Sequence, residues 1–182
     1  WLFYMNSNTP FKSIEDVRNA KEAPKCSATS TGSSGHFIPK LLEEAMGANF
    51  TLVMGYKGGA EQDLAFERGE VVCRALSIPT FFAREPFTTW RRENRVRILL
   101  QTGRKRDPKM PEVPTIHELM NEYKTPANTR ALVSAVLASG DLGRPFITSP
   151  GVPPDQLNTL RDAFRKTMSD PAFLADVKSR KF

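Results

Sequence analysis

The chain has 182 residues, of which 40% are hydrophobic and 25% charged, and these values are ordinary for a globular protein with a sizeable core. Its 26 basic and 20 acidic side chains give a formal net charge of +6, which favours an anionic partner. No stretch approaches the roughly 20 apolar residues of a membrane-spanning helix, so we expect a soluble chain of one large or two small domains.

Strands and helices are predicted to alternate along most of the chain. Apolar runs bounded by turn residues predict strands at residues 1–5, 25–29, 50–54, 71–76, 96–100 and 146–148. Amphipathic spacing and capping residues predict helices from Ser13 to before Pro24, over 37–46, through Leu64 to a stop at Gly69, from Ser77 to Trp90 with a break at Pro86, from Thr115 through Met120, and over 126–139, 154–168 and 171 onward. The helix over 126–139 has an apolar face, and we expect the apolar stripe of the helix over 154–168 to face a core. This order predicts an α/β fold.

Two loops of glycine and small polar residues each connect a predicted strand to a helix. The first runs from Ser30 to Gly35, and the second contains Gly58 and Gly59, which we expect to make its tight turn. Uncovered backbone N–H groups at a helix N-terminus, together with the helix dipole, favour an anion. Both loops leave the carboxyl ends of predicted parallel strands, so we expect them to face one ligand site. Tight turns need glycine even without a ligand, so folding alone also explains either loop.

Cys26 and Cys73 have neither a CxxC motif nor the spacing of a metal site. We therefore expect them to be core thiols. A disulfide is geometrically conceivable if their strands are neighbours, and the sequence leaves their pairing open.

Basic side chains gather at two places, Arg91 to Arg97 and Arg104 to Arg106. Aromatic residues are not interleaved with them, so we expect solvated faces and no nucleic-acid partner. Nucleic-acid binding through residues 91–106 is an alternative, and it predicts an affinity that falls steeply with salt.

The segment around Ser33, Ser34 and His36 contains residue types that hydrolases use as nucleophile and base. The run from Gly32 to Gly35 is one residue short of a Gly-x-Ser-x-Gly elbow, and no Gly-Lys-Ser/Thr follows either glycine cluster. We expect no catalytic residue, no metal and no cofactor. A small hydrolase or transferase that uses Ser34 and His36 at the helix start is the alternative.

Five short motifs stand in an order that resembles a known family. They are Thr31-Gly32-Ser33-Ser34, Gly55-Tyr56-Lys57-Gly58-Gly59, Arg68-Gly69-Glu70-Val71, Pro111-Glu112-Val113-Pro114-Thr115, and Pro150-Gly151-Val152-Pro153 leading to Leu160-Arg161-Asp162-Ala163-Phe164. Together they resemble the tripartite tricarboxylate transporter substrate-binding proteins, the TctC or Bug family, from Thr9 to the last helix. Val72 departs from the family, which often has an acidic residue there.

The resemblance implies a periplasmic receptor of the type II periplasmic-binding-protein fold, with two α/β lobes built on open, mainly parallel sheets. Such a receptor captures a small carboxylate or similar anionic solute and delivers it to membrane transporter subunits. The resemblance places the ligand-binding residues in two loops and at the end of the next strand: Thr31, Gly32, Ser33, Ser34, His36, Tyr56, Lys57, Gly58, Gly59, Ser77 and Thr80.

The resemblance also implies a division of the chain. Residues 1–8 would be a strand crossing between lobes, residues 9–98 the complete second lobe, and residues 99–182 the returning part of the first lobe with the C-terminal helices. The signal peptide and the first half of the first lobe would be missing. We therefore expect a fragment with an incomplete first lobe, which either self-associates through an exposed sheet edge or carries a disordered remnant of the first lobe.

Overall fold

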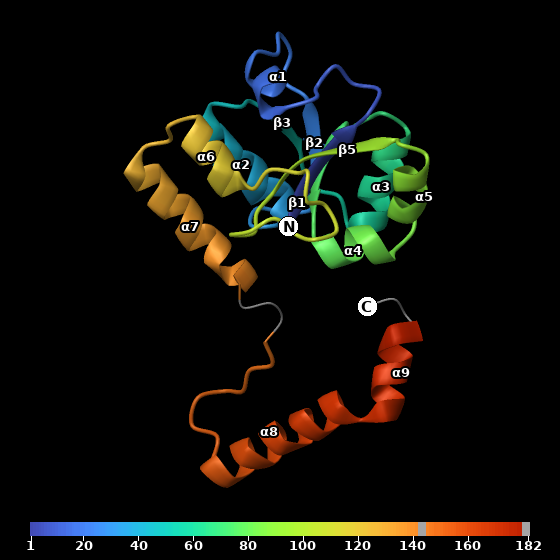
Figure 1. Cartoon of the computed structure of the whole chain (residues 1–182), viewed down its shortest axis with the longest axis vertical. Coiled ribbons are helices and arrows are strands. Elements are labelled where there is room, and N and C mark those ends of the chain that lie inside the picture. The colour runs from blue at the N-terminus through green and yellow to red at the C-terminus, as the bar shows by residue number, and fades with distance from the viewer. Residues whose placement is uncertain (142–144, 180–182) are drawn as a thin grey trace. The chain divides into compact units, whose positions relative to one another are not determined.

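The computed structural model describes residues 1–141 and 145–179, and the chain divides into two compact units, Trp1–Asp141 and Leu142–Phe182. Unit 1 contains the strands β1 (Leu2–Asn6), β2 (Lys25–Ser27), β3 (Thr51–Val53), β4 (Cys73–Leu76) and β5 (Val96–Gln101). Its helices are α1 (Ile14–Arg18), α2 (Ser34–Met46), α3 (Gly59–Glu67), α4 (Ile78–Ala83), α5 (Phe87–Arg92), α6 (Ile116–Glu122) and α7 (Ala127–Asp141). Unit 2 contains α8 (Pro154–Ser169) and α9 (Pro171–Ser179). Figure 1 shows these elements.

The described strands form one sheet in the order β3-β2-β4-β1-β5. β2 pairs in parallel with β3 and β4, whereas β1 lies between β4 and β5 and is antiparallel to both. The first predicted strand is therefore a central strand of the sheet. The predicted α/β fold is confirmed, and all strands of this sheet except β1 run in the same direction.

Helices cover both faces of the sheet, as Figure 1 shows, with α2 and α6 on one side and α3, α4 and α5 on the other. The side chains of β1 alternate between these layers, as strand geometry requires. Phe3 packs in the core under α2, whereas Tyr4 packs in the core under α3 and α5. Both side chains are fully buried, so β1 joins the two halves of the core.

Most of the predicted helix starts are confirmed, but the first helix ends at Arg18, well before Pro24, and the helix predicted over 126–139 continues to Asp141. Ser13 and Thr115 each form a capping box with the acidic residue three positions later. Gly47 directly after α2, and Gly69 after the C-cap Arg68 of α3, adopt left-handed conformations. The helix predicted from residue 77 to 90 is interrupted at Pro86, as expected, and forms the separate helices α4 and α5.

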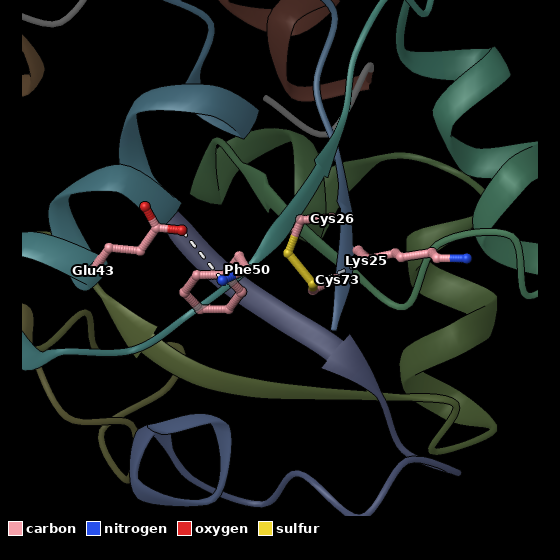
Figure 2. Close-up of a disulfide and its surroundings, with 5 residues drawn as sticks. All are labelled: Lys25, Cys26, Glu43, Phe50 and Cys73. Atoms are coloured by element: carbon pink, nitrogen blue, oxygen red, sulfur yellow. Dashed lines mark hydrogen bonds between the residues drawn. A yellow bond between two sulfur atoms is a disulfide. The ribbon is translucent and has the colours of Figure 1, made fainter. Parts of the chain in front are cut away.

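A disulfide joins Cys26 and Cys73, so the expectation of free core thiols is wrong. Parallel pairing of β2 with β4 places these two residues in register, with their Cα atoms 4.5 Å apart. Figure 2 shows the bond between the two strands, beside Phe50, whose backbone N–H donates to the Glu43 carboxylate at 3.2 Å. Both cysteines are fully buried. The bond therefore fixes the register of β2 against β4 from within the core.

Helices α6 and α7 pack in unit 1, although we expected a lobe boundary near residue 99. Ile116 of α6 and Val133 of α7 belong to the same buried cluster as Phe3 of β1. The compact unit ends at Asp141. The assignment of residues 1–8, 9–98 and 99–182 to a crossing strand and two lobes of a longer protein stays a prediction.

The apolar face predicted for α7 is only half covered in unit 1. Val133 and Leu137 are buried, whereas Leu132 is 50% exposed and Val136 is 36% exposed. α7 therefore presents part of its apolar surface outside the core of unit 1.

Unit 2 differs from the sequence-based expectation in two respects. Residues 146–148 form no strand, because the described residues of unit 2 contain no other strand to offer backbone partners. Phe146 is 88% exposed. The stripe of α8 that we predicted to face a core is also exposed, including Leu160 and Phe164. No helix in residues 1–141 and 145–179 is long and apolar enough to cross a membrane.

Gly35 should be needed for the packing of α2 on the sheet. A Cβ atom at this position would lie 2.4 Å from the Ser27 carbonyl oxygen and 3.1 Å from the Ala28 Cα, both of which are backbone atoms. Gly35→Ala should therefore lower the free energy of unfolding by about 1–3 kcal/mol, although alanine favours helices. Gly58→Ala is the matched control, because its Cβ would meet no atom within 4 Å. Equal stability of the two variants in urea unfolding would contradict this packing.

The disulfide should contribute about 2–4 kcal/mol to stability, since it closes a long loop between Cys26 and Cys73. Urea unfolding of the chain with and without reductant measures this contribution. A thiol assay of the chain unfolded without reductant gives an independent check. We expect no free thiol, and two reactive thiols would contradict the bond.

Candidate functional site

Three loops that contain the predicted ligand-binding residues leave the same edge of the sheet. They follow β2, β3 and β4, which are adjacent and parallel, so their carboxyl ends point the same way. Each loop leads into a helix, α2, α3 or α4. The sheet topology therefore supports the predicted convergence of these loops on one edge, which is where open α/β sheets bind ligands.

The loop after β2 is held by hydrogen bonds among its own residues and to β4. The Ser33 hydroxyl donates to the Ser30 carbonyl at 2.8 Å, and Gly32 adopts a left-handed conformation with φ +91°. The Ser34 hydroxyl donates to the Ala75 carbonyl at 3.4 Å, which ties the start of α2 to β4. Thr31 is exposed at the tip of this loop. The loop is thus ordered by contacts that leave the first amides of α2 outside the helical hydrogen-bond pattern.

The loop after β3 turns at Gly55 rather than at the glycine pair. Gly55 has φ +95°, whereas Gly58 is fully extended at φ −178°, a conformation that any residue adopts. Our prediction that Gly58 and Gly59 make the tight turn is therefore wrong. Gly58 caps α3 without a side chain, and a Cβ atom there would meet no atom within 4 Å. The glycine leaves open space at the start of the helix.

The starts of α2 and α3 differ in their electrostatics. The first turn of α2 contains no acidic residue. The first turn of α3 contains Glu61, whose carboxylate accepts a hydrogen bond from the Lys57 backbone N–H at 2.8 Å. A carboxylate at a helix N-terminus occupies the position that an anion would favour. The start of α2 is therefore a more favourable binding site for an anion than the start of α3.

The remaining predicted residues contribute in different ways. His36 is half-buried in the first turn of α2, and the Lys57 side chain is exposed. Tyr56 packs against the core under α3. Burial raises the pKa of the Tyr56 hydroxyl, and the negative charge of Glu70 raises it further. Ser77 donates to the Thr80 hydroxyl at 2.7 Å and so stabilises the start of α4.

Sequence reasoning missed a buried ion pair beneath the second loop. Arg74 of β4 pairs with Asp63 of α3, and its side chain is only 7% exposed. The same Arg74 nitrogen donates to the Gly59 carbonyl at 3.3 Å. Burial raises the pKa of Asp63, and the Arg74 charge opposes this rise. A basic residue inside an otherwise apolar strand was the signal that could have found this pair.

Two buried hydroxyl groups lie on either side of Arg74. Tyr4 of β1 is the register partner of Arg74 on one side. Ser27 of β2 lies next to Arg74 on the other side, because each of the two residues follows one cysteine of the disulfide. Neither hydroxyl finds a hydrogen-bond partner among the described residues. Burial raises the pKa of Tyr4, against the effect of the nearby Arg74 charge. This row of polar groups lies on the sheet face opposite the disulfide, because successive side chains alternate.

The geometry of Ser34 and His36 does not resemble a catalytic pair. Both residues are in α2 and two positions apart, and side chains at this spacing do not face each other on a helix. The Ser34 hydroxyl is instead directed to the Ala75 carbonyl. Within the described residues, no group of three or more His, Cys, Asp or Glu side chains is arranged to hold a metal ion.

Two surface hollows are lined by residues outside these loops. In unit 2, a groove of about 860 Å³ runs between residues 145–148 and α8 and is lined mainly by apolar side chains such as Phe146 and Leu160. In unit 1, a shallower hollow of about 420 Å³ lies beside α1, between Phe11 and Lys21. Neither hollow contains a predicted ligand-binding residue.

Comparison with solved structures finds the same fold in periplasmic binding proteins. A TctC solute binding protein from Polaromonas matches with a TM-score of 0.60 and 15% identity, over 99% of this chain and 56% of that one. The periplasmic binding protein BugD matches with a TM-score of 0.56 and 18% identity, over 99% and 55%. R. palustris Rpa4515 with adipate matches with a TM-score of 0.54 and 22% identity, over 79% and 51%. The chain thus spans about half the length of these structures.

A search of curated proteins returned no match. The model of the family described as "Tripartite tricarboxylate transporter family receptor" (TctC) matches residues 3–181, nearly the whole chain. The chain belongs to the TctC family of tripartite tricarboxylate transporter receptors and has the α/β fold of the TctC and Bug periplasmic binding proteins.

Proposed function

We propose that this chain supplies a ligand-binding part of an extracytoplasmic receptor that captures a small carboxylate for a tripartite tricarboxylate transporter. The observation that carries the proposal is the convergence of the loops after β2, β3 and β4 on one sheet edge, where each loop leads into a helix. Family membership supports the role as a transporter receptor. The adipate in the structure of R. palustris Rpa4515 supports a carboxylate as the class of solute.

The anion would bind mainly at the start of α2. The amides of Ser34 and Gly35 precede the first helical hydrogen bonds, and α2 is long enough to have a substantial dipole. The hydroxyl of Ser33 is already directed to the Ser30 carbonyl, so backbone groups rather than this side chain would hold the carboxylate. The net charge of +6 adds a favourable long-range field for an anion.

The disulfide supports an extracytoplasmic location. Disulfides persist in oxidising compartments, including the bacterial periplasm, and are rare in the reducing cytosol. The bond between Cys26 and Cys73 is buried at the centre of the sheet, where it is a structural element of the fold. This agrees with BugD, which is a periplasmic binding protein.

A binding role without catalysis fits this site better than the hydrolase alternative, because Ser34 and His36 do not face each other. Nucleic-acid binding is also disfavoured, because several of the basic side chains have partners within the chain. Arg91 lies over the Phe82 ring at 4.2 Å, and Arg97 donates to the Phe11 carbonyl at 3.1 Å.

Carboxylate binding to this chain should be detectable and weak. The described loops contact a ligand from one edge of the sheet, and a small ligand gains much of its affinity from enclosure on all sides. We expect a dissociation constant of about 1 mM, near −4 kcal/mol, for the best of a panel of mono-, di- and tricarboxylates in calorimetry. Absence of binding by every acid of the panel at tens of millimolar would refute the proposed function.

Gly58→Val should weaken carboxylate binding more than it weakens the fold. The extended backbone and the open space at Gly58 accept a side chain, but the added methyl groups would cover the start of α3. We expect the affinity to fall by about tenfold or more, equivalent to 1.4 kcal/mol or more, with stability within about 1 kcal/mol of the wild type. Lys57→Ala is the control and should have a small effect, because the Lys57 side chain is exposed. An unchanged affinity of Gly58→Val would remove α3 from the site.

Glu61→Gln should strengthen carboxylate binding. The substitution removes a negative charge from the first turn of α3 but keeps an oxygen that can accept from the Lys57 N–H. Two charges about 4 Å apart in water interact by about 1 kcal/mol, and Glu61 lies beside an open loop, so we expect a two- to fivefold gain in affinity. The gain should shrink as salt is added. A loss of affinity would show that Glu61 itself supports the ligand.

A further inference from the structure

Arg74 is a buried charge that folding alone does not explain. Its side chain projects from β4 into the layer between the sheet and α3, where it is 7% exposed. Burial of an ion pair costs desolvation energy, and replacing such a pair with apolar residues of similar volume is often neutral or stabilising. The pair of Arg74 with Asp63 therefore calls for a reason beyond stability.

The contacts of Arg74 lead to the second loop of the candidate site. One guanidinium nitrogen binds both the Asp63 carboxylate and the Gly59 carbonyl, the latter at 3.3 Å. Its other terminal nitrogen lies 3.1 Å from the place where a Cβ atom on residue 59 would be. Glycine at position 59 thus allows the start of α3 to lie close to the guanidinium, and a larger side chain would require a small shift of Arg74. Arg74 therefore contacts both Gly59, the first residue of α3, and Asp63, one turn further along the helix.

The surroundings leave Arg74 little freedom to move. Its guanidinium lies 5.9 Å from the centre of the Phe87 ring, and Tyr4 stands beside it in the β1–β4 register. Tyr4 is in turn packed against the Phe66 ring of α3, at 5.3 Å between ring centres. Charge, aromatic packing and β4 therefore fix the position from which Arg74 holds the start of α3.

Arg74 is also coupled to the first loop through β4. It directly follows Cys73, which is bonded to β2, and it directly precedes Ala75, whose carbonyl accepts from the Ser34 hydroxyl at 3.4 Å. Three successive residues of β4 thus hold β2, α3 and α2. Contacts with this one strand therefore hold both of the helix starts that face the candidate site.

We propose that Arg74 is a positioning residue of the ligand site, which fixes the start of α3 and the Gly58–Gly59 segment relative to the start of α2. The inference rests on the proposed function, because it assigns Arg74 to the site that would bind the carboxylate. Arg74 acts through the Gly59 backbone and not by touching the ligand. Its removal should therefore loosen the loop and weaken binding while the core remains folded.

The test uses the double variant Arg74→Met/Asp63→Leu in the full 182-residue chain. Removing both partners avoids an unpaired buried charge, so global stability should stay close to that of the wild type. In the absence of ligand, we expect amide hydrogen exchange of residues 57–62 to become about tenfold faster or more, with exchange in β1 and β4 unchanged. The affinity for adipate should fall by about tenfold.

Tyr4→Phe is the matched control, because it removes a hydroxyl from the same buried row and leaves the contact between Arg74 and Gly59 in place. It should change neither loop exchange nor affinity. Arg74→Lys should rescue the effect only in part, since a single ammonium group cannot reproduce the planar contacts of a guanidinium.

Unchanged amide exchange of residues 57–62 in the double variant would overturn the positioning role. Uniformly faster exchange across the whole chain would also overturn it, because it would indicate that the ion pair only stabilises the fold. Faster loop exchange with an unchanged affinity would also overturn it. A wild-type chain that binds no carboxylate would refute the proposed function instead. The exchange data would then still decide whether Arg74 fixes the start of α3.

Discussion

The register between β2 and β4 is the constraint on which the rest of the site depends. The buried bond between Cys26 and Cys73 fixes that register on one face of the sheet, and it puts Ser27 and Arg74 side by side on the other. This register aligns the strands from which the loops after β2 and β4 begin, and β3 pairs with β2 in turn. Because the crosslink lies within the core, the positions of the loops follow from the sheet itself and do not require contacts between the loops.

The two helix starts at this edge are prepared differently for an anion. The start of α2 carries no acidic residue and approaches the backbone of β2 so closely that residue 35 must be glycine. The first turn of α3 already contains the Glu61 carboxylate, and Arg74 donates a hydrogen bond to the carbonyl of its first residue, Gly59. A carboxylate would therefore bind chiefly at α2, and α3 would shape the opposite wall. Rigid support beneath a polar loop reduces the ordering cost of binding.

Much of the fold could be predicted from the sequence, since apolar period, glycine stops and capping boxes are local signals. The convergence of the loops also followed from the alternation of strands and helices. The pairing of Cys26 with Cys73 could not be predicted, because it depends on the order of strands in the sheet. The strand expected at residues 146–148 failed because a strand needs a neighbour, which local sequence does not reveal. Arg74 was missed because its partners are distant in sequence or belong to the backbone.

The most direct test of the account is a titration of the ¹⁵N-labelled chain with adipate, followed by amide chemical shifts, with the uncharged diamide of the same length as the control. Backbone amides at the start of α2 should respond to the carboxylate if they hold it. The account predicts the largest shifts at Ser34 and Gly35, smaller shifts at residues 58–60, and none of these shifts with the diamide. Shifts confined to unit 2, or equal responses to adipate and the diamide, would contradict it.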